Sequence, residues 1–184
     1  MPEYRSHIAL KLLSLTPDES TIFSIGCGNG FVEGDLVRSG RSVRAIDYLE
    51  EAVHLARNKG VDAFAADFFD LGPEDVVGAS AVYADGLLGH LLTGEDGARP
   101  AVEKLASLEL RPGSFVVISN DSPRSPTADF APHEKVPGFW FVSRAYVEEC
   151  LTEVGFEVVE SYYFPYVRPL SGLRNRTMCV ALVP

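Results

Sequence analysis

The chain has few of the residues that mark secreted, metal-binding or membrane-spanning proteins. Its 184 residues include three cysteines, Cys27, Cys150 and Cys179, and none of them belongs to a C-x-x-C pair or to a cluster with histidine. This scattered arrangement predicts neither a metal site nor a disulfide framework and favours a reducing, cytoplasmic setting. No apolar run approaches eighteen residues, and the N-terminus lacks the basic and then apolar pattern of a signal peptide. We therefore expect neither a membrane-spanning helix nor secretion.

Basic residues are scarce too. The chain carries 16 Lys and Arg against 26 Asp and Glu, which gives a formal net charge of −10. Nucleic-acid-binding proteins need a cationic surface to displace the counterions of phosphates, and anionic membranes attract polybasic segments. Neither kind of partner is expected. The one basic cluster, Arg168, Arg174 and Arg176, surrounds Pro169 and Gly172 and predicts a solvated loop.

The chain also lacks internal repeats, low-complexity tracts and linkers that would divide it. Its length and its apolar content of 46% are ordinary for one globular domain, so residues 1–184 are predicted to form a single domain. Because the charge is acidic, the expected substrate is a small molecule or a protein side chain. Nothing in the sequence indicates an oligomeric state.

What the chain does have is a glycine-rich run directly after an apolar stretch. Residues 21–25 combine β-branched and aromatic side chains and predict a buried strand, which Gly26, Gly28 and Gly30 follow at alternate positions. Glycines there allow a tight turn and let a ligand lie directly on the backbone. The dinucleotide fingerprint G-x-G-x-x-G would need a further glycine where Phe31 stands, which disfavours a nicotinamide-dependent reductase. By itself, the run also fits a purely structural turn between a strand and a helix.

An acid closes each of the next two apolar stretches. Residues 42–46 end at Asp47, whose two carboxylate oxygens can accept hydrogen bonds from both ribose hydroxyls. Asp47 could instead cap the following helix, and the two roles are compatible. Residues 62–66 end at Asp67 and Phe68, which offer an acceptor for the adenine amino group and an apolar surface for its ring. The alternative is that these two are a turn residue and a core residue.

The remaining segments continue to alternate between strand and helix patterns. Strands are predicted at 79–84, 114–119, 156–164 and 177–183, and helices at 2–15, 31–39, 97–110 and 144–154. This order predicts an α/β fold with a doubly wound, mostly parallel seven-stranded sheet and an antiparallel C-terminal hairpin. In such sheets, ligands bind beyond the carboxyl ends of the strands.

In order and spacing, these motifs resemble the class I S-adenosylmethionine (SAM) methyltransferases over about residues 20–184. The glycine run resembles motif I of that family. The passage "LRPGSFVVIS" at 110–119 resembles the turn into its fifth strand, and "LTEVGFEVVES" at 151–161 resembles the helix that leads to its last hairpin. The resemblance implies a Rossmann-like fold, SAM as the cofactor and methyl transfer to an oxygen or nitrogen of a small metabolite. It also implies cofactor contacts, which fall on Gly26, Cys27, Gly28, Gly30, Asp47, Tyr48, Asp67, Phe68 and Asp85.

The chain departs from the family pattern in two places. The family usually carries Asp or Glu two residues before the first glycine, where this chain has Ser24, a hydroxyl without a charge. Glu33 or Asp35, both close in sequence, could supply the acid instead. The D/N-P-P-Y/F motif of many methyltransferases that modify amino groups of bases and glutamines is replaced by "YADG" at 83–86, which argues against those substrates. A protein methyltransferase and a SAM-binding protein without methyl transfer, of a regulatory or aminopropyl-transferring type, remain alternatives.

Two histidines are candidates for a general base. His90 follows the fourth predicted strand, and His133 lies in a long insert before the next helix. Imidazole titrates near neutral pH, so either residue could take a proton from an acceptor. Alternatively, His90 packs against or caps the next helix, and His133 is an ordinary surface residue.

The insert, residues 120–142, is longer than most connections in compact domains and predicts a lid over the substrate. It holds four prolines and the aromatic run 139–141, which includes the only tryptophan. We expect Asp121 and Trp140 to contact the acceptor. The alternative is that the aromatic run fills the core.

The first twenty residues are predicted to contain a short amphipathic helix with Ile8, Leu12 and Leu15 on one side. In many members of the resembling family, such a segment folds over the cofactor, which would bring Arg5 near the methionine carboxylate. The alternative is a helix that simply packs on the edge of the sheet.

Overall fold

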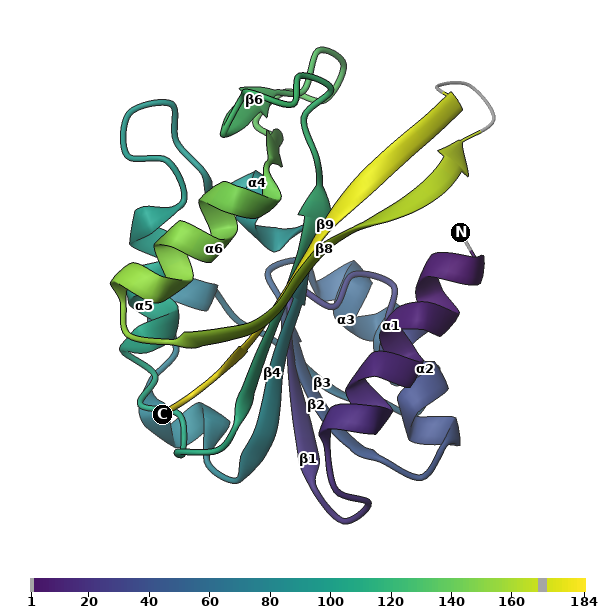
Figure 1. Cartoon of the computed structure of the whole chain (residues 1–184). Coiled ribbons are helices and arrows are strands. Elements are labelled where there is room, and N and C mark those ends of the chain that lie inside the picture. Colours follow the sequence, from purple (N-terminus) through teal and green to yellow (C-terminus); the bar gives the residue numbers. More distant parts are fainter. Residues whose placement is uncertain (1, 169–171) are drawn as a thin grey trace.

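A seven-stranded sheet forms the centre of the computed structural model, which describes residues 2–168 and 172–184 (Figure 1). Its strands are β1 (Thr21–Ile25), β2 (Ser42–Asp47), β3 (Asp62–Ala65), β4 (Ala79–Asp85), β5 (Phe115–Asp121), β8 (Glu157–Arg168) and β9 (Gly172–Leu182). They lie in the order β3-β2-β1-β4-β5-β9-β8, and the first five in this order are parallel. Strand β9 is antiparallel to both β5 and β8. The predicted α/β fold, with its mostly parallel sheet and antiparallel last hairpin, is confirmed.

Helices cover both faces of the sheet (Figure 1). One face carries α1 (Pro2–Leu15), α2 (Phe31–Arg38) and α3 (Glu50–Arg57), and the other carries α4 (Leu87–Leu91), α5 (Arg99–Ala106) and α6 (Arg144–Glu153). Two short 3-10 helices, η1 (Phe68–Asp70) and η2 (Pro73–Val76), follow β3. None of the helices within the described ranges combines the length and the apolar character needed to span a bilayer.

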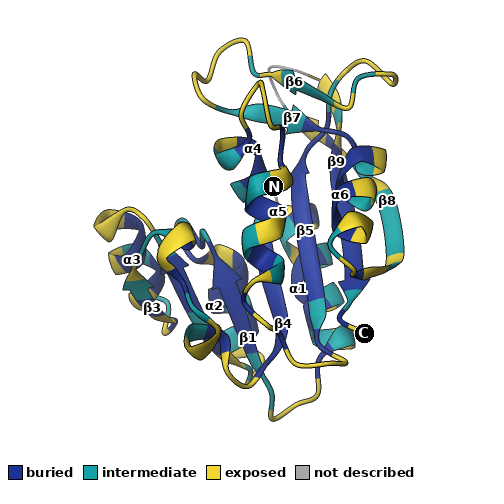
Figure 2. Cartoon of the chain, turned by 90° about the vertical axis from the view of Figure 1, so that its left-hand side faces the viewer, coloured by how far each residue is buried: buried dark blue, intermediate teal, exposed yellow. Residues whose placement is uncertain are grey.

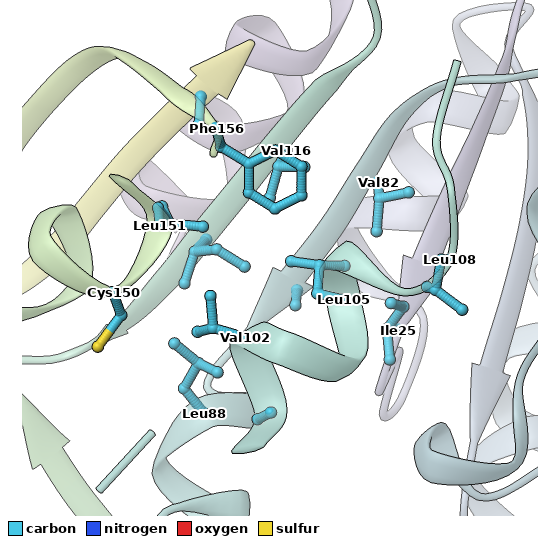
Figure 3. Packing of buried hydrophobic residues seen from close by; sticks show 14 of the residues in the cluster. Ile25, Val82, Leu88, Val102, Leu105, Leu108, Val116, Cys150, Leu151 and Phe156 are labelled. Carbon is cyan, nitrogen blue, oxygen red and sulfur yellow. The ribbon is translucent and has the colours of Figure 1, made fainter. Parts of the chain in front are cut away.

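The central strands are buried along most of their length because both of their faces are covered, as is usual for parallel strands (Figure 2). Alternation along β1 sends Ile22 toward α1, α2 and α3, and Ile25 toward the opposite helices. On that opposite face, Val82 and Val116 pack with Leu105 of α5 (Figure 3). The two apolar layers hold the sheet rigidly and so fix the positions of its strand ends.

The N-terminal helix forms where the sequence predicts it. Ile8 and Leu12 are spaced by one helical turn and are fully buried against the sheet, and Tyr4 continues the same side of the helix. Burial of each large aliphatic side chain contributes about 1.5–3 kcal/mol. Helix α1 therefore packs on the sheet face, while Tyr4 lies toward the carboxyl ends of the strands.

The insert contains an additional small sheet that the sequence analysis does not predict. Strands β6 (Phe130–Pro132) and β7 (Trp140–Val142) pair antiparallel and lie beyond the carboxyl end of β5 (Figure 2). Each strand has only three residues, and one residue is Pro132, so no alternating pattern marks them in the sequence. The insert is therefore a folded hairpin with loops on either side.

Candidate functional site

The glycine loop, residues 26–30, lies at the carboxyl end of β1. The backbone N–H groups of Gly26 and Cys27 donate to the carbonyl oxygen of Ile46 at 2.9 and 3.0 Å, which ties the loop to β2. Gly30 has a φ of +64°, and a Cβ there would lie 2.7 Å from the Cα of Ala56, so close packing on α3 requires glycine. Gly28 has a φ of +52° and would meet nothing within 4 Å. Gly28 therefore presents open backbone on which a ligand can lie.

Cys27 is part of this loop but is not a reactive thiol. Its side chain is buried, and burial raises the pKa of the thiol to about 12. Because the thiolate is the reactive form of cysteine, the side chain is inert near neutral pH. Cys27 contributes its backbone to the loop.

Asp47 joins the glycine loop to the start of α3. Its Oδ2 accepts the N–H of Gly28 at 2.8 Å, and its Oδ1 accepts the N–H of Leu49 at 3.0 Å. Each carboxylate oxygen has a second lone pair, and the side chain is half-buried, so Asp47 can also accept from ligand hydroxyls. The neighbouring Tyr48 is exposed.

At the end of β3, the two residues predicted to contact adenine take different positions. Asp67 caps η1, with Oδ1 accepting the N–H of Phe69 at 2.9 Å, and its other oxygen remains available. Phe68 is 6% exposed and packs in the core below the sheet, which matches the alternative given for it and not the predicted contact with the ring. Phe69, which the sequence analysis did not single out, is exposed, and so is Tyr48.

Glu33 of α2, one of the two acids considered as a replacement, contacts Ser24 of β1. Ser24 Oγ donates to Oε1 of Glu33 at 2.6 Å, and both side chains are buried. Burial raises the pKa of Glu33 to about 7, and the hydrogen bond from Ser24 opposes this effect only in part. Asp35, the other acid considered, instead pairs with Arg5, whose Nε lies 2.7 Å from Asp35 Oδ2. Arg5 of α1 therefore pairs with an acid of α2, in place of the predicted contact with the methionine carboxylate.

A buried ionic network links the carboxyl ends of β4 and β5. Asp85 Oδ1 accepts from the hydroxyls of Tyr4 and Ser119, each at 3.0 Å, and pairs with the guanidinium of Arg176. Arg176 Nη1 also lies 3.1 Å from Asp121 Oδ1. Helix α1 therefore closes this part of the sheet edge through the Tyr4 hydroxyl.

Burial and neighbouring charges together set the ionisation of Arg176 and Tyr4 in this network. Burial lowers the pKa of Arg176, whereas Asp85, Tyr4 and Asp121 together raise it by more. The net shift is therefore upward, and the guanidinium stays charged. Burial, followed by the charge of Asp85, raises the pKa of Tyr4 well above its ordinary value. Tyr4 therefore remains a neutral donor to Asp85.

Asp121 belongs to this network as well, where the sequence analysis expected a substrate contact. Its Oδ1 accepts from Tyr166 Oη at 2.5 Å and from Arg176, and its Oδ2 pairs with Arg168 at 2.8 Å. The side chain is buried, so both oxygens serve to hold Arg168 and Arg176 in place. Asp121 positions cations and does not present a free carboxylate.

The prediction that the three C-terminal arginines form a solvated loop is wrong for Arg176, which is 7% exposed. In the β5–β9 pair, Arg176 lies directly opposite Asp121. Along β9, Arg176 shares its face with Met178 and Val180, which are buried in the core. This alternation is visible in the sequence and could have identified the side chain as inward-facing; Pro169, named with the cluster, lies outside the described residues.

The two candidate histidines lie on either side of Phe139. His90 is exposed at the end of α4, and its ring centroid is 4.8 Å from that of Phe139. His133 Nδ1 accepts the N–H groups of Lys135 and Val136 at 3.0 and 3.1 Å, so the neutral ring carries its proton on Nε2. In this tautomer, Nε2 of His133 is a hydrogen-bond donor.

Alternation along β7 separates Trp140 from Phe141. The Trp140 ring packs edge-on against Phe130 at 5.8 Å and joins the apolar core, whereas Phe141 lines a cavity on the other side of the hairpin. Trp140 therefore takes the core position that the sequence analysis gave as its alternative. The aromatic residue of β7 that lines the cavity is Phe141, not Trp140.

That cavity has a volume of about 710 Å³ and lies between the insert and the β8–β9 hairpin. His133, Phe141, Arg168 and Arg174 are among its lining residues, and none of the predicted cofactor residues lines it. The sheet edge therefore carries two neighbouring regions, the glycine loop with its acids and this cavity.

The chain resembles known proteins in its sequence and in its fold. No protein-family model matches the chain. The chain is 63% identical over 182 residues to a protein described as a tabtoxin biosynthesis enzyme from Pseudomonas amygdali pv. tabaci, and the match covers 99% of this chain and 72% of that protein.

Solved structures show the fold at much lower sequence identity. A magnesium protoporphyrin IX methyltransferase from Synechocystis PCC 6803 with bound SAM superposes with a TM-score of 0.71 at 19% identity, covering 99% of this chain and 79% of its own. The [4+2]-cyclase SpnF superposes with a TM-score of 0.71 at 14% identity, covering 97% and 81%. The fold is that of the class I SAM-dependent methyltransferases.

Proposed function

This chain belongs to the same family as the tabtoxin biosynthesis enzyme, and we propose that it is a SAM-dependent methyltransferase acting on an oxygen or nitrogen of a small metabolite. One observation carries the proposal. The strand order reverses between β1 and β4, and the glycine loop ends β1 while Asp85 ends β4. In open α/β sheets, such a switch point is where ligands bind.

The residues at this switch point suit the parts of SAM. The open backbone at Gly28 would receive the amino-acid end, Asp47 the ribose and the free oxygen of Asp67 the adenine amino group. In the described part of the chain, Asp85 Oδ2 accepts no hydrogen bond, so it would be available to the cofactor's ammonium group. When bound, SAM supplies a sulfonium methyl group whose carbon–sulfur bond breaks with its electrons left on sulfur.

The chain's own contribution is mainly positioning. An activated methyl group needs the acceptor atom held in line with the bond that breaks, and correct placement can supply much of the rate. Tyr4, Arg176 and Ser119 fix one oxygen of Asp85, which holds the side chain in place at the end of β4. A base is needed only when the acceptor arrives protonated and weakly acidic, and exposed His90 is the candidate for that step.

A second function is favoured by one comparison. The [4+2]-cyclase SpnF has this fold at a TM-score of 0.71, so the fold alone does not determine the reaction. A protein that binds SAM without transferring its methyl group would use the same glycine loop and acids. Only the products of the reaction distinguish the two functions.

The test is a methylation screen with SAM carrying a deuterated methyl group. The purified chain is incubated with a library of small acids, alcohols and amines, and products are followed by mass spectrometry. The proposal predicts a product that gains the labelled methyl group together with one equivalent of S-adenosylhomocysteine (SAH). Tight SAM binding with no labelled product across the library would favour the second function.

A further inference from the structure

The cavity between the insert and the β8–β9 hairpin concentrates positive charge. Its lining includes Arg124, Lys135, Arg168 and Arg174, a quarter of the 16 Lys and Arg in the chain. Among the described residues that line it, one is acidic, Glu134, although the chain has 26 Asp and Glu. In a protein of net charge −10, this segregation makes the cavity a local region of positive potential.

Most of this charge is uncompensated. Arg168 pairs with Asp121 at 2.8 Å. Within residues 2–168 and 172–184, no carboxylate lies at ion-pair distance from Arg124, Lys135 or Arg174. Like charges gathered around one cavity repel each other, so an anion that enters relieves this repulsion. Guanidinium groups are planar and can donate two parallel hydrogen bonds to a carboxylate, whereas a lysine ammonium acts as a point charge.

The other walls suit a carbon skeleton. The Phe141 ring faces the cavity, with the Arg174 guanidinium 5.8 Å from its centroid. His133 adds an N–H donor at Nε2, because its Nδ1 is occupied by backbone N–H groups. A volume of about 710 Å³ matches that of ordinary small-molecule sites. The cavity therefore offers an apolar surface, one neutral donor and several cations.

We infer that this cavity binds a small organic acid through at least one carboxylate, and that this acid is the methyl acceptor. The second half of the inference rests on the proposed function. The ionic network runs from the lining of this cavity to the end of β4, because Arg168 holds Asp121 and Arg176 holds both Asp121 and Asp85. In this inference, the carboxylate of the acid is held by Arg174 and Lys135, which line the cavity.

Calorimetric titration of the full chain with succinate tests the inference, with neutral succinamide and inorganic phosphate as comparison probes. The double variant Arg174→Gln, Lys135→Gln removes two unpaired cations from the walls. The matched control Arg111→Gln removes an exposed arginine just before β5, whose opposite end leads into the insert. We expect the parent to bind succinate and not succinamide, the double variant to lose at least tenfold in affinity, and the control to stay within twofold.

Each contrary result has a definite meaning. Equal binding of succinamide, or unchanged succinate affinity in the double variant, overturns the inference. Tighter binding of phosphate than of succinate overturns the assignment to a carboxylate. SAH titration of the same proteins separates the two proposals: succinate binding by a parent that does not bind SAH overturns the proposed function and leaves the anion site standing.

Discussion

Glu33 is a buried acid of α2 that contacts strand β1. It lies in the first turn of α2, is 3% exposed and accepts a hydrogen bond from Ser24 of β1. A carboxyl group therefore lies beside Ser24, the position at which the resembling family usually carries an acid. The raised pKa of Glu33, to about 7, follows from this burial and makes the side chain sensitive to pH.

The pH dependence of stability tests this placement of Glu33. An unfolded Glu ionises near pH 4.5 but the folded one near pH 7, so the folded state binds more protons between these values and loses stability as pH rises. Glu33→Gln keeps an acceptor for Ser24 and does not titrate. Between pH 5 and 8, the variant should gain roughly 2–3 kcal/mol in unfolding free energy relative to the parent. Urea denaturation measures the difference in unfolding free energy between the variant and the parent. If this difference stays constant from pH 5 to 8, Glu33 does not have a raised pKa in the folded state.

Asp47 is the residue on which cofactor affinity should depend most. Asp47→Ala removes two charge-assisted acceptors for a ribose, each worth roughly 1.5–3 kcal/mol, as well as the bond to the Gly28 N–H. We expect SAH affinity to fall at least tenfold, whereas Asp62→Ala, which removes an exposed acid at the start of β3, changes it by less than twofold. Calorimetry measures both, and equal affinities in the two variants would exclude Asp47 from the site.

Sequence alone identified the backbone positions of the site better than the directions of its side chains. The glycine loop and the acids after β2 and β3 follow apolar strands, so their places on the sheet edge could be predicted. The direction of Phe68 could not, because it depends on how η1 packs beneath the sheet. Asp121 was expected to face a substrate, and its partners on β8 and β9 come from residues more than forty positions away.

Among the elements, β7 is a short strand whose two faces have different surroundings, the core on one side and the cavity on the other. Its alternation turns Trp140 to the core and Phe141 to the cavity, although the two residues are adjacent. The hairpin formed with β6 holds this arrangement above the end of β5. The insert is thus a folded wall of the cavity, and its aromatic residues are not equivalent.

Alanine substitutions in β7 separate these two roles. Trp140→Ala removes packing against Phe130 and the core and should cost about 2–4 kcal/mol of unfolding free energy. Phe141→Ala faces the cavity and should cost about 1 kcal/mol, while weakening the binding of an acid in the cavity. Urea denaturation compares the two. If Phe141→Ala destabilises the chain as much as Trp140→Ala does, the assignment of the two faces is wrong.

The regular elements were predictable where local pattern and tertiary packing agree. Strands β1, β2 and β4 are mainly apolar, and α6 is capped by Ser143, whose Oγ accepts the N–H of Tyr146. Strand β6 has no such pattern in its sequence. It forms by pairing with β7, the other strand of the insert. Its formation depends on long-range contacts that single-sequence reasoning does not represent.

At the scale of the whole molecule, the two proposed regions differ in charge. The switch point between β1 and β4 is surrounded by acids, Asp47, Asp67 and Asp85, which suit a cationic cofactor. The cavity beyond β5 is lined by four cations and one acid, a balance that suits an anionic acceptor. Arg176 lies between them and is paired with an acid on each side. A cation and an anion would therefore be drawn to neighbouring places on one sheet edge.

Titration with SAH is the most direct test of the central claim, which is that the switch point between β1 and β4 is a SAM site. SAH is the product of methyl transfer and is not consumed, so calorimetry of the full chain reports binding alone. The account predicts one molecule of SAH bound per chain, with no binding of NAD, because Phe31 stands where the dinucleotide fingerprint needs glycine. Binding of NAD without any binding of SAH would contradict it.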